Sequence, residues 1–275
     1  MADQQHQQHR PDEQHRPARP TIAELRAVTQ PESVRGRRNS EHWTADLYQR
    51  RVSPYLTRWL LTTGITANGV TVLMIVTGAA SGAALLVPGL VGATLALLLG
   101  QLQMLWDCCD GEVARWRQTF SPVGFFLDKL GHTVAESAIP LALGVRADGG
   151  FDSLGGWTTM GAVLAVLVLV NKSLNDAVHL ARAASDLPRL ADRPEEAAPQ
   201  VSTVRRLRSL ARFVPFHRVF HSVEMTMLAF VAAVGDALSG GDLAWTRGLV
   251  AVLVPVAALT VVGHLLAILT SRRLR

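Results

Sequence analysis

Six long apolar stretches limit most strongly the folds open to this chain. A helix needs about 20 predominantly apolar residues to cross the hydrocarbon core of a bilayer. The chain has 275 residues and a mean hydropathy of +0.22, and its apolar residues are gathered in blocks rather than spread evenly. The sequence therefore predicts an all-α integral membrane protein with six transmembrane helices, at residues 68–88, 90–110, 121–145, 154–175, 217–238 and 247–270.

Two of these stretches carry ionisable residues in their interior. The third contains Asp128, Lys129, His132 and Glu136, and the fifth contains Glu224. An ionisable group inside a membrane span costs at least about 2.5–3.5 kcal/mol on insertion scales and is usually retained for function. These residues are therefore candidates for a site, with structural contacts between helices as the alternative. For Glu224 the sequence favours neither reading.

Arginines gather at one set of helix ends and so predict the orientation. They precede the first stretch, follow the second, fill the 176–216 connection and close the chain, whereas the connections on the other side hold only Arg146. Cytoplasmic segments carry such an excess. We therefore expect a plasma-membrane protein with both termini and the site in the cytoplasm. Orientation and anionic lipid explain the net charge of +5, so no nucleic-acid partner is expected.

The part before the first stretch divides in two. Residues 1–40 are rich in Gln, His, Arg and Pro and predict a disordered cytoplasmic tail. Residues 41–63 mix aromatic, apolar and basic residues, which is typical of an interfacial amphipathic helix lying on the membrane surface. Residues 64–275 then form the six-helix membrane domain.

The segment WDCCDGEVARWR (106–117) places charge at the end of the second apolar stretch. On a helix, Asp107, Asp110, Gly111 and Ala114 share one face, which combines two carboxylates with two small side chains. Glu112 and Arg117 point elsewhere, and we expect them to be solvated. The adjacent Cys108 and Cys109 cannot form an ordinary disulfide and are expected to be packing residues.

The third stretch repeats this arrangement, and the two faces can meet as a helical hairpin. Gly124, Asp128 and His132 are four residues apart, and a short turn with Ser121 and Pro122 precedes them. Three converging carboxylates repel one another unless a cation lies between them. Oxygen-rich clusters suit hard divalent ions. We expect Mg²⁺ or Mn²⁺, as one ion or two, between Asp107, Asp110 and Asp128; an ion-binding transporter would satisfy the same reasoning.

The pattern Asp107-x2-Asp110-Gly111-x2-Ala114-Arg115-x8-Gly124-x3-Asp128 resembles the signature of the CDP-alcohol phosphotransferase family. The family signature ends in a further aspartate, and seven of its eight positions are present. The resemblance implies six transmembrane helices behind an interfacial helix, a cytoplasm-facing site and a homodimer. It also implies a transferase of phospholipid synthesis, which moves a phospho-alcohol, expected to be phosphatidyl, from a CDP-linked donor to an acceptor hydroxyl and releases CMP.

The resemblance also implies roles by position. Asp107, Asp110 and Asp128 would ligate the metals that bridge the donor pyrophosphate. Gly111 and Ala114 would make room for the cytidine nucleotide, and Arg115 would pair with a phosphate. The further donor contacts would be Ser121 and Asn68, which matches a family asparagine near the start of the first span.

His132 stands where the family has its last aspartate, which is credited as general base and second-metal ligand. Imidazole can accept a proton near neutrality and can bind metal. Three outcomes stay open: a working base variant, a one-metal or differently selective enzyme, or an inactive relative. Glu136, one turn further, would supply a carboxylate or form an interhelical contact, and the contact is favoured.

The resemblance implies the substrates only by chemical class. CDP-diacylglycerol or another CDP-alcohol would be the donor, and an alcohol or sugar-alcohol phosphate the acceptor. A non-catalytic cation-binding or transport protein is the alternative from another class, although such a site needs no Arg115 beside its carboxylates. His264 is expected to be packed and hydrogen-bonded. Candidates for an acceptor phosphate pocket, whose arginines are equally explained as membrane anchors, are Lys172, Asn175, Asp176, His179, Arg182, Arg212 and Arg218.

Overall fold

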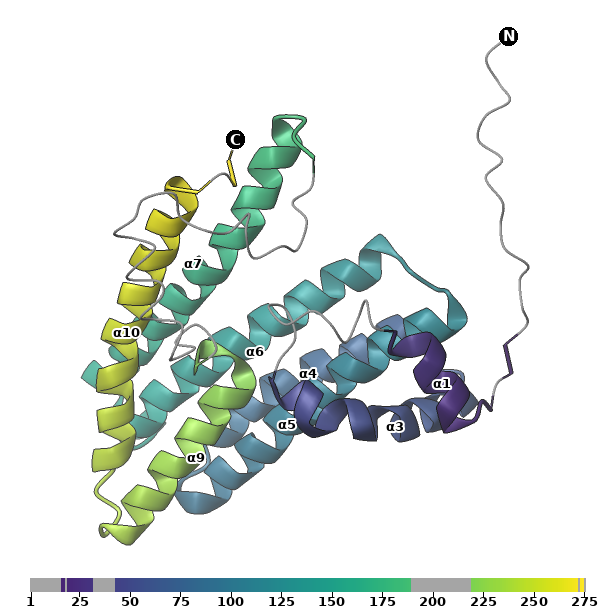
Figure 1. The fold of residues 1–275 in the computed structure, drawn as a ribbon. Helices are drawn as coiled ribbons and strands as arrows, with labels where there is room; N and C mark the ends of the chain where they lie inside the picture. Colours follow the sequence, from purple (N-terminus) through teal and green to yellow (C-terminus); the bar gives the residue numbers. More distant parts are fainter. Residues whose placement is uncertain (1–15, 18, 32–42, 189–218, 272, 275) are drawn as a thin grey trace.

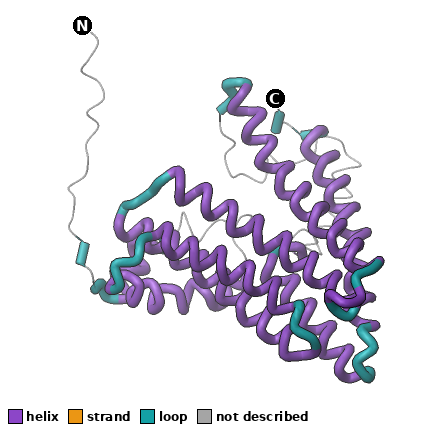
Figure 2. The backbone as a smooth tube through the Cα atoms, turned by 180° about the vertical axis from the view of Figure 1, so that it is seen from behind, coloured by secondary structure: helices purple, strands orange, loops and turns teal. Residues whose placement is uncertain are grey.

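A computed structural model describes residues 16–17, 19–31, 43–188, 219–271 and 273–274, and this part of the chain is helical without strands (Figures 1 and 2). Short π-helical (Ala45–Gln49) and 3₁₀ (Phe151–Ser153) segments accompany the main helices. The main helices are α1 (Ile22–Thr29), α3 (Arg50–Thr62), α4 (Ala67–Leu85), α5 (Gly89–Arg117), α6 (Pro122–Asp148), α7 (Gly156–Ala184), α9 (Ser222–Leu238) and α10 (Ala244–Leu269).

Four of these helices, α4, α5, α7 and α10, are long and apolar enough to cross a membrane. The all-α membrane class is thereby confirmed. The other two predicted spans do form helices, but α6 carries several charged residues and α9 has only 17 residues. Membrane crossing by α6 and α9 stays a prediction, as does the total of six spans.

Helix α4 is the platform on which the two motif-bearing helices rest. It packs along both α5 and α6, whereas α5 and α6 make few direct backbone contacts with each other. Gly78 lies where α4 meets both partners, because a β-carbon there would come within 2.9 Å of the Ala135 β-carbon on α6 and 3.4 Å of Gln103 on α5. The predicted hairpin faces therefore meet through their side chains beside α4, rather than by close packing of the α5 and α6 backbones.

The remaining helices complete the bundle around one core. Figure 1 shows α7 and α10 side by side, and α9 packs against α5 and α10. Fully buried side chains join five helices: Leu85 on α4, Leu143 on α6, Leu164 on α7, Met225 on α9 and Val250 on α10. This core packs against the C-terminal half of α6. The first turns of α6, which carry the motif residues, lie outside it.

Two aspartates close the helix pairs at the end of the bundle away from the motif. Asp148 accepts hydrogen bonds of 2.7 Å from the backbone N–H and 2.6 Å from the hydroxyl of Thr158, at the start of α7. Asp236 accepts equivalent bonds from the N–H and hydroxyl of Thr246, at the start of α10. Helix starts leave N–H groups without partners within the helix, and each aspartate satisfies part of that need.

The predicted disordered tail is wrong for residues 22–29, which form α1. Thr21 and Glu24 make a reciprocal capping box at its start, and Leu25 is completely buried. These two features outweigh the polar composition around them, because the cap satisfies orphan N–H groups and the leucine anchors the helix. Most of the rest of that tail lies outside the described residues.

The predicted helix at 41–63 is present from residue 45, as the π-helical segment and α3. Its outward side exposes Leu47, Tyr55 and Trp59. Apolar and aromatic side chains on a surface helix suit a membrane interface. Its place at that interface stays a prediction.

Candidate active site

The motif segment is helical throughout, as its spacing requires. Helix α5 runs through Arg117 and ends at Gln118, whose left-handed backbone (φ 55°) turns the chain. Helix α6 then begins at Pro122, and the Ser121 hydroxyl caps it by accepting the Gly124 N–H at 3.0 Å. Both motif halves therefore lie at the same end of the bundle, with the residues of α6 in its first turns.

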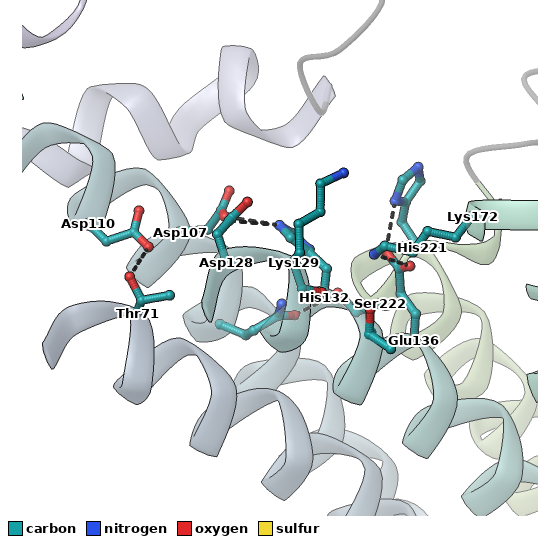
Figure 3. A network of polar contacts seen from close by, with 12 residues as sticks. Thr71, Asp107, Asp110, Asp128, Lys129, His132, Glu136, Lys172, His221 and Ser222 are labelled. Atoms are coloured by element: carbon teal, nitrogen blue, oxygen red, sulfur yellow. Dashed lines mark hydrogen bonds and ion pairs between the residues drawn. The ribbon is translucent and has the colours of Figure 1, made fainter. Parts of the chain in front are cut away.

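Three motif side chains converge there (Figure 3). Asp107 of α5 and Asp128 and His132 of α6 each offer a ligand atom, and these atoms all lie within 4.8 Å of one another. His132 Nε2 lies 3.1 Å from an Asp107 carboxylate oxygen and 3.6 Å from one of Asp128. All three side chains are partly exposed. Two carboxylates with one imidazole suit a divalent cation such as Mn²⁺.

Asp110 lies outside this group of three. Its carboxylate accepts a 2.7 Å hydrogen bond from the hydroxyl of Thr71 on α4 (Figure 3). Among the described residues, the structure thus brings together three of the four predicted ligands and pairs the fourth with α4. Thr71 had no sequence signal, because its contact depends on α4 lying beside α5.

The residues implied for nucleotide contact fall in two places. A β-carbon at Gly111 would lie 3.0 Å from Arg115 Nη2, so the guanidinium folds back over this glycine. A β-carbon at Gly124 would lie 2.9 Å from the Asn68 side-chain oxygen and 3.4 Å from the Ser121 hydroxyl. The small residues therefore do lie next to polar side chains. Ala114 is instead half-buried against an apolar cluster of α1, α3 and α5.

Comparison with known proteins identifies the segment that holds this arrangement. A model of the CDP-alcohol phosphatidyltransferase family matches residues 64–184, which include α4 to α7. Over this segment the chain is similar to that family, as the motif predicted. A search of curated proteins found no match. Members of the family use divalent metals, in agreement with the Asp-Asp-His group.

A second polar network lies one turn beyond His132 (Figure 3). Glu136, whose side chain is 6% exposed, accepts a 2.8 Å bond from Lys172 Nζ on α7. Its other oxygen lies 3.2 Å from Nδ1 of His221, just before α9. The favoured reading of Glu136 as an interhelical contact is confirmed, and it does not join the metal-ligand group. Sequence reasoning missed His221.

The other acceptor-pocket candidates are dispersed. Asp176 pairs with Lys129 at 3.2 Å, Asn175 accepts from Arg273, and Arg182 donates to backbone carbonyls of Pro188 and Arg273. His179 is exposed, and Arg212 and Arg218 lie outside the described residues. These contacts do not bring the candidates into one pocket.

The contacts of His264 and Glu224 bear on the roles that the sequence suggested for them. His264 has Nδ1 2.9 Å from the Asn171 side-chain oxygen, so the predicted packed, hydrogen-bonded histidine is confirmed. Glu224 accepts a hydrogen bond from the Trp43 indole N–H, which supports its structural reading.

The expectation of a solvated side chain is wrong for Glu112, whereas Arg117 is half-buried. Glu112 is fully buried and accepts 2.6 Å hydrogen bonds from the hydroxyls of Ser53 and Thr57 on α3. Arg117 donates to the backbone carbonyl of Leu61, in the last turn of α3, and to that of Ile65, just after α3. The reason is that α3 lies against α5, so the side of α5 turned away from the motif face is covered by protein. Cys108 and Cys109 are buried there as packing residues, as predicted.

We expect Glu136→Ala to lower the free energy of unfolding by about 3 kcal/mol, because it leaves Lys172 without its partner in a largely buried place. Asp176→Ala removes the exposed Lys129–Asp176 pair, which joins the same two helices, and should cost about 0–1 kcal/mol. Thermal or denaturant unfolding in detergent compares the two variants. Equal losses would contradict the assignment of Glu136 as the main polar link between α6 and α7.

Proposed function

We propose that this protein is a membrane-embedded transferase that moves a phospho-alcohol group, phosphatidyl in our reading, from a CDP-linked donor to an acceptor hydroxyl and releases CMP. The observation that carries the proposal is the convergence of Asp107, Asp128 and His132 inside the family-matched segment. The plasma membrane, the cytoplasmic site and a homodimer belong to the same proposal.

Asp107 and Asp128 are proposed to hold a divalent cation at the donor pyrophosphate, with Asp110 available beside them. When bound, such an ion neutralises the charge that develops on the phosphate oxygens. Gly111 leaves room for the Arg115 guanidinium beside α5, and Arg115 is proposed to offer its two terminal nitrogens as planar donors to a nucleotide phosphate. Asn68 and Ser121, which lie next to Gly124, are proposed as further contacts of the donor.

His132 is proposed to take the proton of the acceptor hydroxyl. The acceptor oxygen forms a bond to the phosphorus that carries the alcohol, and the bond from that phosphorus to the bridging oxygen breaks. CMP leaves with the bridging oxygen and its electron pair. The proton passes to the imidazole, which can hold it near neutrality. Asp107 lies 3.1 Å from Nε2 and is placed to orient the ring and stabilise its charged form.

The test is CMP release by the purified protein in lipid nanodiscs. CDP-diacylglycerol and a soluble CDP-alcohol are each offered with a panel of alcohols and sugar-alcohol phosphates, with Mn²⁺ or Mg²⁺. We expect CMP only with donor, acceptor and ion together, and EDTA should stop the reaction. No release and no CMP binding under any combination would sink the proposal and favour a non-catalytic cation-binding protein or an inactive relative.

A further inference from the structure

The segment before α3 reaches the last turn of the motif helix. The Arg16 guanidinium donates to the carbonyls of Arg115 at 2.7 Å and Trp116 at 2.9 Å, and it lies 5.5 Å from the centre of the Trp116 ring. The Trp116 indole N–H in turn donates to the Pro17 carbonyl. The last carbonyls of a helix lack partners within it. The N-terminal segment therefore caps the end of α5.

Helix α1 is anchored on the same end by apolar burial. Leu25 is completely buried in a cluster with Leu60 and Leu61 of α3 and Val113 and Trp116 of α5. A buried leucine stabilises such a contact strongly, since its whole side chain leaves water. Leu25 is thus the residue on which docking of α1 depends.

A buried carboxylate links the end of α1 to the neighbouring helices. The Gln30 side-chain N–H₂ donates to Glu112 at 2.8 Å and to the Arg50 carbonyl at 2.8 Å. Ser53 and Thr57 complete the shell of Glu112. The carboxylate is fully buried with these donors around it, so α1, α3 and α5 meet at one satisfied polar centre.

The same docking holds Arg115. Its Nε donates to the Thr29 carbonyl at the end of α1, at 2.6 Å. Its two terminal nitrogens lie 3.0 and 3.1 Å from the position of a β-carbon on Gly111. One edge of the guanidinium is therefore bound by α1, while the opposite end lies over the glycine.

We infer that docked α1 is a positioning element that fixes Arg115 over Gly111 and so prepares the phosphate contact for the nucleotide. The inference rests on the proposed function, because it assumes that Gly111 and Arg115 face CMP or the CDP donor. An arginine side chain has many rotamers, and fixing it before the ligand arrives reduces the entropy lost on binding. Helix α1 thus belongs to the site although the family match begins at residue 64.

The experiment compares Leu25→Asp with Ala27→Asp in the full-length protein. Both add the same charge to α1, but Leu25 is buried and Ala27 is exposed. Loss of the charged hydrogen bond that holds Arg115 should weaken CMP binding and raise KM for the CDP donor by about ten-fold in Leu25→Asp, with kcat within about two-fold. In Ala27→Asp, CMP binding and the KM for the CDP donor should stay at the wild-type level. Binding of Mn²⁺ should be unchanged in both variants. Gln30→Ala, a milder change at the same anchor, should shift CMP binding in the same direction if Leu25→Asp fails to fold.

A double-variant cycle tests whether the effect passes through Arg115. Lysine has no Nε donor, so in an Arg115→Lys background Leu25→Asp should add little further loss of CMP binding. An equal loss in both backgrounds, or wild-type binding in Leu25→Asp and Gln30→Ala, would overturn the inference while leaving the transferase proposal intact. A wild-type protein that neither binds nor releases CMP would overturn both.

Discussion

Asp107→Asn is expected to reduce CMP release by about a thousand-fold, because loss of a metal ligand removes the charge stabilisation on which phosphoryl transfer depends. Asp107 is the α5 member of the three-residue group and also the nearest partner of His132. Asparagine keeps the size and removes the charge, so both the ion and the imidazole lose their partner. Initial rates at saturating donor and Mn²⁺ binding measure the two losses.

Asp152→Asn is the matched control for this prediction. Asp152 is exposed in the 3₁₀ segment between α6 and α7, at the other end of α6 from the motif. The same chemical change there should leave both measurements at the wild-type level. Release by Asp107→Asn at a rate close to that of the control would exclude Asp107 as an essential ligand.

His132→Ala is expected to reduce turnover by about a hundred- to ten-thousand-fold, the usual contribution of a positioned general base. Binding of CMP should stay within a few-fold of wild type, because the proposed nucleotide contacts come from Gly111 and Arg115. The measurements are single-turnover CMP release and equilibrium CMP binding. Unchanged turnover would exclude His132 as the base.

His132→Asp separates the roles of the imidazole. It restores the residue that the family signature has at this position, and we expect it to retain far more activity than His132→Ala. Mn²⁺ binding in the two variants then shows whether the side chain is needed as a ligand. Loss of Mn²⁺ binding in His132→Ala together with recovery in His132→Asp would identify His132 as a metal ligand. Full Mn²⁺ binding in both variants would show that His132 acts as a base and not as a ligand.

Periodicity predicted the helices and the faces of the motif, because both depend on residues close in sequence. It correctly placed Asp107 on one helix and Asp128 with His132 on the next. It could not separate Asp110 from Asp107, because the two residues share a face of α5. The separation arises from α4, whose Thr71 binds Asp110, and a neighbouring helix cannot be read from spacing on α5.

Sequence reasoning misjudged α1 and Glu112 for two different reasons. A polar, proline-containing tail predicts disorder, yet Thr21 and Glu24 have the three-residue separation of a capping box directly before Leu25. That local signal was present in the sequence. The burial of Glu112 was not, because its hydrogen bonds come from Gln30, Ser53 and Thr57, which lie 82, 59 and 55 residues away.

The position of α4 has a consequence for how such a site can change over generations. The group of three draws on α5 and α6, but the contact at Gly78 keeps these two helices at their present separation. A larger side chain at Gly78 would push α6 outward and stretch the distance from Asp107 to Asp128 and His132. Ion preference could then drift by substitutions in a helix that contributes no ligand to the group, while every liganding residue is preserved.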